Sequence, residues 1–99
     1  MEDKDKTIVQ TEDVRVRQMF LGVGAEIPWH FHTEVVDTMY CLQGEMQVEL
    51  ADPPEVTVLK VGEGCEISAG RRHRVSLVGN EPVSYLLIQG VGKYDFQKI

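Results

Sequence analysis

Short runs of alternating apolar and polar residues, each ended by turn-forming residues, are the feature that most limits how this chain can fold. No window of about 11 or more residues shows the apolar spacing of an amphipathic helix. Strands of about 4–8 residues separated by turns are instead typical of an all-β protein, and closure into a barrel or jelly roll removes exposed strand edges. The runs lie at Val14–Leu21, Thr38–Leu42, Met46–Leu50, Val56–Leu59, Val75–Val78 and Ser84–Gln89.

Length and charge narrow the class of protein. The chain has 99 residues, enough for one domain, and we expect a flexible N-terminus over residues 1–6 and a single domain over residues 7–99. The net charge of −6 argues against a nucleic-acid partner, because phosphate contacts need clustered cations. No apolar run approaches the roughly 20 residues of a membrane span, and Met1–Lys6 is not followed by the apolar stretch of a signal peptide. We therefore expect a cytoplasmic protein with no membrane partner.

The two cysteines, Cys41 and Cys65, form neither a disulfide framework nor a CxxC pair. Free cysteines are usually buried and behave as small hydrophobic residues, which is the simplest interpretation of both. A pocket-lining or redox-sensitive Cys41 is the alternative.

The chain has three histidines, His30, His32 and His73. His30 and His32 flank one residue in a segment expected to be extended, so both imidazoles point to the same face and can bind one metal ion together. Imidazoles and the nearby carboxylate of Asp37 suit one divalent ion of iron, manganese, nickel, copper or zinc. Taken alone, the HxH pattern also fits two surface or half-buried histidines, and His73 alone fits an ordinary structural residue.

The spacing around His30 and His32 resembles the first sequence motif of the cupin family. That motif has a glycine, five residues, HxH, three or four residues, a glutamate, six residues and a glycine. In this chain Gly24 and Gly44 stand at the two glycine positions, and Asp37 stands where the family has glutamate.

The region around His73 resembles the second sequence motif of the cupin family. That motif has a glycine, five residues, PxG, two residues, a histidine, three residues and an asparagine. Gly62, Gly70 and His73 match, whereas Ser68 replaces the proline and Leu77 occupies the asparagine position. The two motifs together cover roughly residues 20–89 and use all three histidines.

The resemblance implies a small double-stranded β-helix, or jelly-roll, barrel that holds one metal ion inside one end. By position, His30, His32 and His73 would be ligands, and Asp37 would replace the carboxylate ligand. Aspartate is shorter than glutamate by about 1.5 Å, which leaves three arrangements open. Asp37 binds the metal directly, it acts through a water molecule, or the three histidines bind the metal without it. Glu34 is a weaker candidate, on the face of His32 if the strand stays regular.

The resemblance also implies a homodimer built by sheet-to-sheet packing, with Val14–Leu21 or Thr7–Gln10 as an edge strand. Such a fold places a pocket for a small-molecule ligand beside the metal.

Strand alternation predicts which side chains face this pocket. If Asp37 points inward, Met39 and Cys41 do so as well, either as pocket lining or as plain core. Trp29 precedes the first histidine and either caps the cavity or anchors the strand. Arg71 lies before His73, where its guanidinium would pair with a substrate carboxylate at the mouth. Residues 90–96 are interpreted as an extension that docks on the surface.

Two functions are compatible with these residues. The first is a metal-dependent enzyme, an oxygenase, isomerase or lyase, acting on a small oxygenated organic molecule, since a divalent ion with open positions polarises a carbonyl or enolate. The second is a non-catalytic binding or sensing module whose metal holds a ligand or ties strands together. Fold alone does not separate the two, because one fold hosts many functions.

Overall fold

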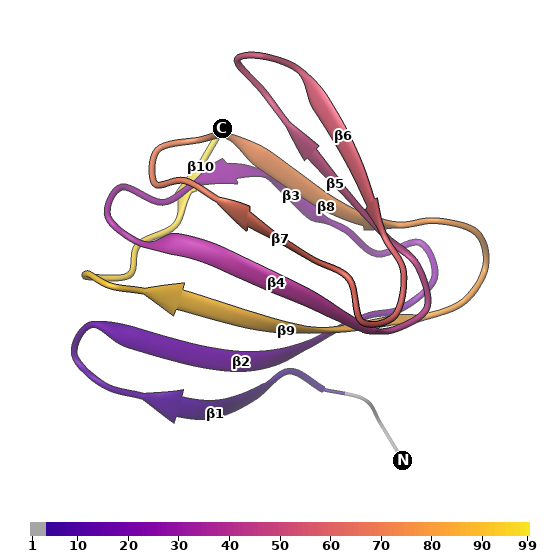
Figure 1. The fold of residues 1–99 in the computed structure, drawn as a ribbon, viewed down its shortest axis with the longest axis horizontal. Helices are drawn as coiled ribbons and strands as arrows, with labels where there is room; N and C mark the ends of the chain where they lie inside the picture. Colours follow the sequence, from indigo (N-terminus) through magenta and orange to yellow (C-terminus); the bar gives the residue numbers. More distant parts are fainter. Residues whose placement is uncertain (1–3) are drawn as a thin grey trace.

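The computed structural model describes residues 4–99, and in this range every regular element is a β-strand (Figure 1). The all-β prediction is therefore confirmed, and no helix in the described range is long and apolar enough to span a membrane. The strands are β1 (Lys6–Gln10), β2 (Val14–Leu21), β3 (Ile27–Phe31), β4 (Val36–Gln43), β5 (Met46–Leu50), β6 (Glu55–Leu59), β7 (Gly64–Ile67), β8 (His73–Leu77), β9 (Val83–Gly90) and β10 (Gln97–Lys98).

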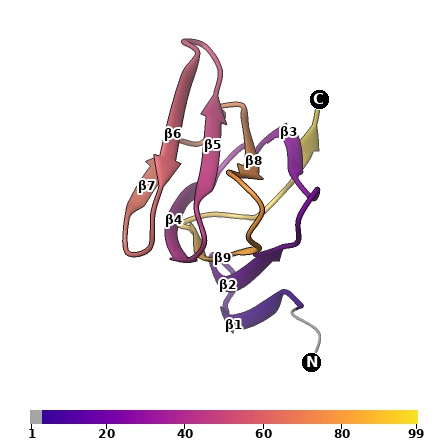
Figure 2. The same cartoon turned by 90° about the vertical axis from the view of Figure 1, so that its right-hand side faces the viewer.

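The strands form two antiparallel five-stranded sheets that face each other (Figures 1 and 2). One sheet has the order β1-β2-β9-β4-β7, and the other has the order β10-β3-β8-β5-β6. Most neighbouring strands are far apart in sequence, as for β2 with β9 and β3 with β8, so the chain passes repeatedly between the sheets. Residues from distant parts of the sequence therefore meet inside.

The core lies between the two sheets and follows the alternation of the strands. On β4, Asp37, Met39 and Cys41 are buried, whereas the side chain of Tyr40 is 44% exposed. Met39 and Cys41 belong to one apolar cluster with Met46 and Val48 on β5 of the opposite sheet. The prediction that Met39 and Cys41 share the inward face of Asp37 is confirmed.

Strand register places the polar inward residues in rows. Across the first sheet, Arg15 on β2 lies opposite Gln89 on β9, and Gln89 lies opposite Asp37 on β4. Across the second sheet, His30 on β3 lies opposite His73 on β8. These rows lie toward one end of the barrel, and the apolar cluster fills the rest of the interior.

The N-terminal segment partly differs from the expected division at residue 6. Residues 1–3 lie outside the described range, β1 begins at Lys6, and Asp5 accepts a hydrogen bond of 2.9 Å from the backbone N–H of Phe20 on β2. The expected extension at the other end of the chain returns along β3, where Gln97 pairs with Phe31 and Lys98 with His30.

Candidate metal centre

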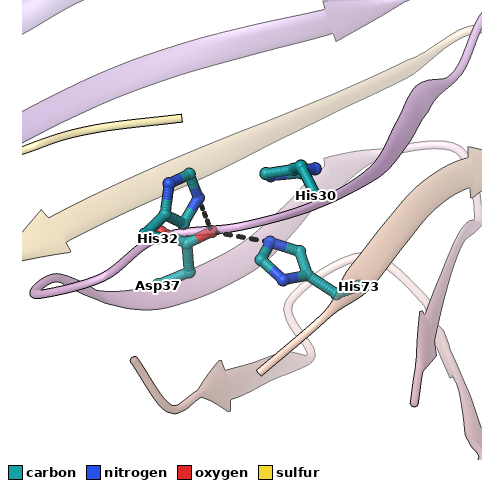
Figure 3. A group of neighbouring side chains, drawn as sticks. All are labelled: His30, His32, Asp37 and His73. Atoms are coloured by element: carbon teal, nitrogen blue, oxygen red, sulfur yellow. Dashed lines mark hydrogen bonds and ion pairs between the residues drawn. The ribbon is translucent and has the colours of Figure 1, made fainter. Parts of the chain in front are cut away.

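Four buried side chains meet at one end of the barrel (Figure 3). His30 comes from β3, His32 from the residue that follows β3, Asp37 from β4 and His73 from β8. One nitrogen or oxygen atom from each side chain lies within 4.8 Å of the corresponding atom of every other. The three histidines thus converge from opposite halves of the sequence, in the arrangement that the resemblance to the cupin motifs implies.

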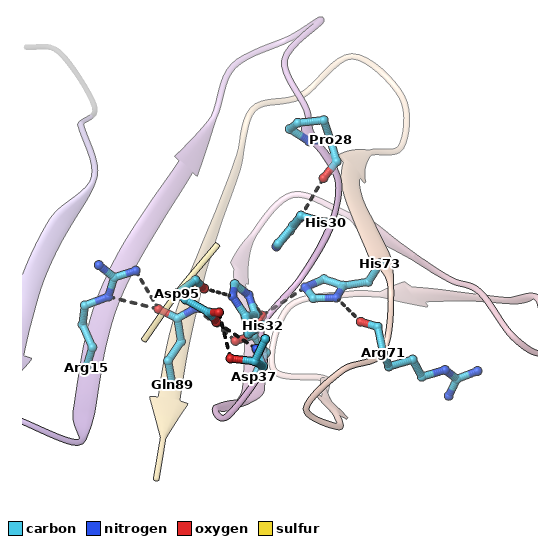
Figure 4. A network of polar contacts seen from close by, with 10 residues as sticks. Arg15, Pro28, His30, His32, Asp37, Arg71, His73, Gln89 and Asp95 are labelled. Carbon is cyan, nitrogen blue, oxygen red and sulfur yellow. Dashed lines mark hydrogen bonds and ion pairs between the residues drawn. The ribbon is translucent and has the colours of Figure 1, made fainter. Parts of the chain in front are cut away.

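Backbone carbonyl groups orient each imidazole (Figure 4). The Nδ1 atoms of His30, His32 and His73 donate to the carbonyl oxygens of Pro28, Asp95 and Arg71, at 2.7, 2.6 and 2.8 Å. Because a carbonyl oxygen can only accept a hydrogen bond, each Nδ1 carries a proton. Each Nε2 is therefore the atom available to a metal, and hydrogen bonds of this kind fix the ring and its tautomer in metal sites.

The contacts of Asp37 show why the centre suits a cation. Its Oδ2 atom lies 3.1 Å from Nε2 of both His32 and His73. If these rings are neutral, their Nε2 lone pairs face the carboxylate and the contacts are repulsive. They become attractive only when protons on the rings or a metal cation supply positive charge. Three imidazole nitrogens and one carboxylate are a ligand set that divalent transition metals accept.

Burial and mutual contacts set the charge states of these groups. Burial lowers the pKa of His30 from an ordinary 6.5 to about 4. Burial acts in the same direction on His32, but the hydrogen bond and charge of Asp37 outweigh it and raise the pKa of His32. Burial opposes ionisation of Asp37, yet hydrogen bonds from His32, His73 and Gln89 hold the pKa of Asp37 well below its usual range. The ionised carboxylate of Asp37 and the neutral imidazole of His30 are the states that metal binding requires, whereas a metal ion competes with a proton for His32.

Asp37 is held in place by a chain of contacts that crosses the sheet (Figure 4). The side-chain amide of Gln89 donates to Asp37 Oδ1 at 3.0 Å. Its oxygen accepts from Nε and Nη2 of Arg15, at 3.1 and 2.9 Å. Only one orientation of the amide suits both neighbours, because a guanidinium only donates and a carboxylate only accepts. Gln89 and Arg15 are thus positioning residues for the carboxylate.

The C-terminal segment, expected to dock on the surface, covers the centre. The ring of Phe96 stacks on His30 with centroids 4.3 Å apart and planes 12° apart. Asp95 binds His32 through its carbonyl and accepts two hydrogen bonds of 2.8 Å from Thr33 through its carboxylate. Tyr94 lies under the guanidinium of Arg15, 3.6 Å from ring centroid to Cζ. We call residues 91–99 the C-terminal strap.

A cavity of about 140 Å³ adjoins the centre. This volume is below the about 300–1,000 Å³ of pockets that take drug-sized ligands, so the cavity suits only a small molecule. Its wall is mixed in character: Arg15 and Arg17 come from β2, Tyr85 from β9 and Tyr94 from the strap, and apolar residues complete it. The apolar lining residues are Met19, Ile27, Met39, Val75, Leu87 and Phe96.

The other predicted pocket residues take different places. Met39 lines the cavity. Cys41 is fully buried in the core, its thiol donates to the carbonyls of Gln43 and Gly44, and burial raises its pKa. Trp29 is half-buried, neighbours His30 on β3 and accepts a hydrogen bond from Ile99 through its carbonyl. Neither Cys41 nor Trp29 is among the residues that line the cavity within the described part of the chain.

Arg71 and Glu34 are engaged away from the four-residue centre. The guanidinium of Arg71 donates to the carbonyls of Ala51 and Pro53 and pairs with Glu55, so Arg71 serves the centre through its carbonyl. β3 ends at Phe31, so the regular strand on which the candidacy of Glu34 depended does not continue. Its carboxylate accepts instead from the backbone N–H of Lys93.

Sequence reasoning missed three polar residues of the cavity, Arg15, Arg17 and Gln89. The alternation of valine and arginine at the start of β2 favours arginines that face solvent, but the structure turns them inward. Met19 and Leu21 could have indicated the inward orientation of the two arginines, because they lie on the same face of β2 and both are buried. Tyr85, Leu87 and Gln89 likewise share the inward face of β9.

The fold and site together define a two-sheet β-barrel with a buried group of three histidines and one carboxylate inside one end, a group that could hold a metal ion. A model of the cupin domain matches residues 17–89, and the chain belongs to the cupin family. No functionally curated protein matches it significantly.

Solved structures with the same fold include a protein with a double-stranded β-helix domain from Klebsiella pneumoniae subsp. pneumoniae MGH 78578. Its TM-score is 0.82 at 24% identity, and the match covers 99% of this chain and 81% of that chain. An oxalate oxidase has a TM-score of 0.80 at 17% identity over 88% of this chain and 46% of its own. An oxalate decarboxylase from Lactobacillus farciminis, in complex with formate, has a TM-score of 0.79 at 16% identity. That match covers 89% of this chain and 27% of the decarboxylase chain. The chain thus spans less than half of either oxalate enzyme, and these similarities establish the double-stranded β-helix fold alone.

Proposed function

We propose that the protein is a metal-dependent enzyme, of the oxygenase, isomerase or lyase class, that acts on a small oxygenated organic molecule. One observation carries the proposal: three imidazoles whose Nδ1 atoms are all committed to carbonyls meet a carboxylate directly beside a cavity. A structural metal site needs no such cavity, whereas a reactive one keeps a position open to substrate. The fold shared with oxalate oxidase and oxalate decarboxylase, which are named for a small oxygenated acid, supports the proposal.

In this proposal His30, His32, His73 and Asp37 hold one divalent ion of iron, manganese, nickel, copper or zinc. A bound ion would supply Lewis acidity, and redox chemistry if it is iron, manganese or copper. Gln89 holds the carboxylate of Asp37 in position, and the C-terminal strap shields the imidazoles from water. Met39 and the other apolar lining residues lower the local dielectric, which strengthens every charge interaction inside the cavity.

A non-catalytic binding or sensing protein is the second candidate. It is favoured by the composition of the cavity wall, where Asp37 is the one carboxylate among the lining residues of the described chain. Because Asp37 is assigned to the metal, a separate acid or base for proton transfer would have to be Tyr85 or Tyr94.

Metal analysis and turnover distinguish the two candidates. Protein purified without added metal is analysed for its metal content, loaded separately with each of the five ions, and tested for oxygen uptake and substrate loss on a panel of small hydroxy and keto acids. The enzyme proposal predicts about one ion per chain and turnover that His73→Ala abolishes and Arg72→Ala preserves, since Arg72 is exposed. Retained metal without turnover of any panel member would instead favour the binding module.

We also propose that the protein is a homodimer that packs through the outer face of the sheet containing β2, β9 and β4. Leu86 and Ile88 are half-buried there, and Tyr40 and Leu42 are 44% and 45% exposed. Light scattering of the wild type tests this, because the proposal predicts a dimer that Leu86→Glu dissociates, and a monomeric wild type at micromolar concentration contradicts it. A cytoplasmic location stays a prediction from the sequence.

A further inference from the structure

The two arginines of the cavity have no acidic partner among residues 4–99. Two other arginines of this range form ion pairs with carboxylates. Arg74 pairs with Glu26 and Glu49, and Arg71 pairs with Glu55. Arg15 and Arg17 make no such pair with any carboxylate of this described range. Two cations are therefore turned into the interior of an acidic protein without a carboxylate of the described chain to neutralise them.

Arg15 and Arg17 differ in how they are held. Arg15 is fixed by the oxygen of Gln89 and by the ring of Tyr94, neither of which carries a charge. The Nε atom of Arg17 is buried and has no hydrogen-bond partner in the described part of the chain. A buried donor without a partner destabilises a protein, so this N–H group is available to a ligand that enters the cavity.

The position of Arg17 suits a ligand that also reaches the metal centre. Arg17 lies two residues from Arg15 on β2, opposite Leu87, which in turn lies opposite Met39. Two residues along a strand span about 6–7 Å, so Arg17 stands one row deeper than the row that contains Asp37. A short molecule lying along the cavity would extend from the one row to the other.

The charge and shape of this wall indicate what binds. The two guanidiniums exceed the single carboxylate of Asp37, so the cavity is cationic, and a divalent metal would make it more so. A guanidinium presents paired N–H donors that match the two oxygens of a carboxylate. The surrounding apolar residues strengthen that attraction.

We infer that the ligand of this cavity is a small carboxylate-bearing anion, with its carboxylate paired to Arg17 and its other end directed at the metal centre. Arg17 is the specificity-determining residue, and Arg15 positions Gln89 and Asp37. The inference rests on the proposed function only for the role of the metal, because the pairing with Arg17 does not require it.

Calorimetric titration with acetate, malonate and succinate, each compared with its uncharged amide, tests the inference. Both Zn²⁺-loaded and chelator-treated protein are titrated. We expect at least one carboxylate to bind the wild type more tightly than its amide, and Arg17→Met to weaken that binding about tenfold to a hundredfold, the loss of a charge-assisted pair. Arg17→Lys should lose less, and Arg72→Met, which removes an exposed arginine, should lose nothing.

Two further measurements keep the test decisive. Arg17→Met should unfold at a temperature no lower than the wild type, because the substitution removes an unpartnered buried donor, and it should retain wild-type metal content. If no carboxylate binds better than its amide, or if Arg17→Met binds as the wild type does, the inference fails even when metal is retained. If metal is not retained but carboxylate binding still depends on Arg17, the inference stands and the proposed metal-dependent function fails.

Discussion

Replacement of Gln89 by leucine tests whether Asp37 takes part in metal binding. The substitution removes the 3.0 Å hydrogen bond from the Gln89 amide to Asp37 Oδ1 and takes the acceptor from Arg15. A hydrogen bond to a charged group contributes about 1.5–3 kcal/mol, which corresponds to a loss of affinity of about tenfold to a hundredfold. Loss of the residues that orient metal ligands weakens affinity over the same range. We therefore expect the Zn²⁺ dissociation constant of Gln89→Leu to rise by that factor.

The assay is competition for Zn²⁺ against a chromophoric chelator, with circular dichroism to establish that the variant is folded. Gln18→Leu is the matched control, because Gln18 also donates across the β2–β9 pair, to Ser84, but does not line the cavity. Its affinity should equal that of the wild type. Wild-type affinity in a folded Gln89→Leu would refute the reasoning, since it would show that Asp37 or its orientation does not matter to the ion.

Three further predictions follow from buried groups and from the strap. In the metal-free protein, His30 should remain neutral down to about pH 4, as measured from its imidazole ¹⁵N shifts. Its lowered pKa stabilises the folded state above pH 6.5, and that contribution is lost as the pH falls. Titration of His30 near pH 6.5 would refute its burial. Burial raises the pKa of Tyr85, so the free energy of unfolding should decline above about pH 10, where unfolded tyrosine ionises, and an unchanged decline in Tyr85→Phe would contradict this. Phe96→Ala removes the ring stacked on His30 and should lower the free energy of unfolding by about 0.5–1.5 kcal/mol; an unaltered value would mean that the strap does not rest on the site.

The histidine centre could be predicted because it depends on short-range spacing. His30 and His32 share a face by strand alternation alone, and the glycine and histidine spacings around His73 resemble those of a barrel that brings the two regions together. Met39 and Cys41 followed by the same alternation. The reach of Asp37 to a metal ion stays a prediction; the structure places its Oδ2 atom 3.1 Å from two imidazole nitrogens.

The second group of site residues depends on long-range pairing that alternation does not specify. Nothing local in the sequence indicates that Arg15 lies opposite Gln89 or that Gln89 lies opposite Asp37, because register between distant strands is set by the whole sheet. The strap was missed for a similar reason. Tyr94, Asp95 and Phe96 resemble an ordinary polar and aromatic tail until β10 pairs with β3 and brings them over the histidines.

Anomalous diffraction from crystals grown with Zn²⁺ tests the central claim most directly. The account predicts one strong peak per chain, about 2.0–2.2 Å from the Nε2 atoms of His30, His32 and His73 and from a carboxylate oxygen of Asp37. A peak held by other residues, or a saturated crystal in which any of the three Nε2 atoms turns away from the ion, would contradict it.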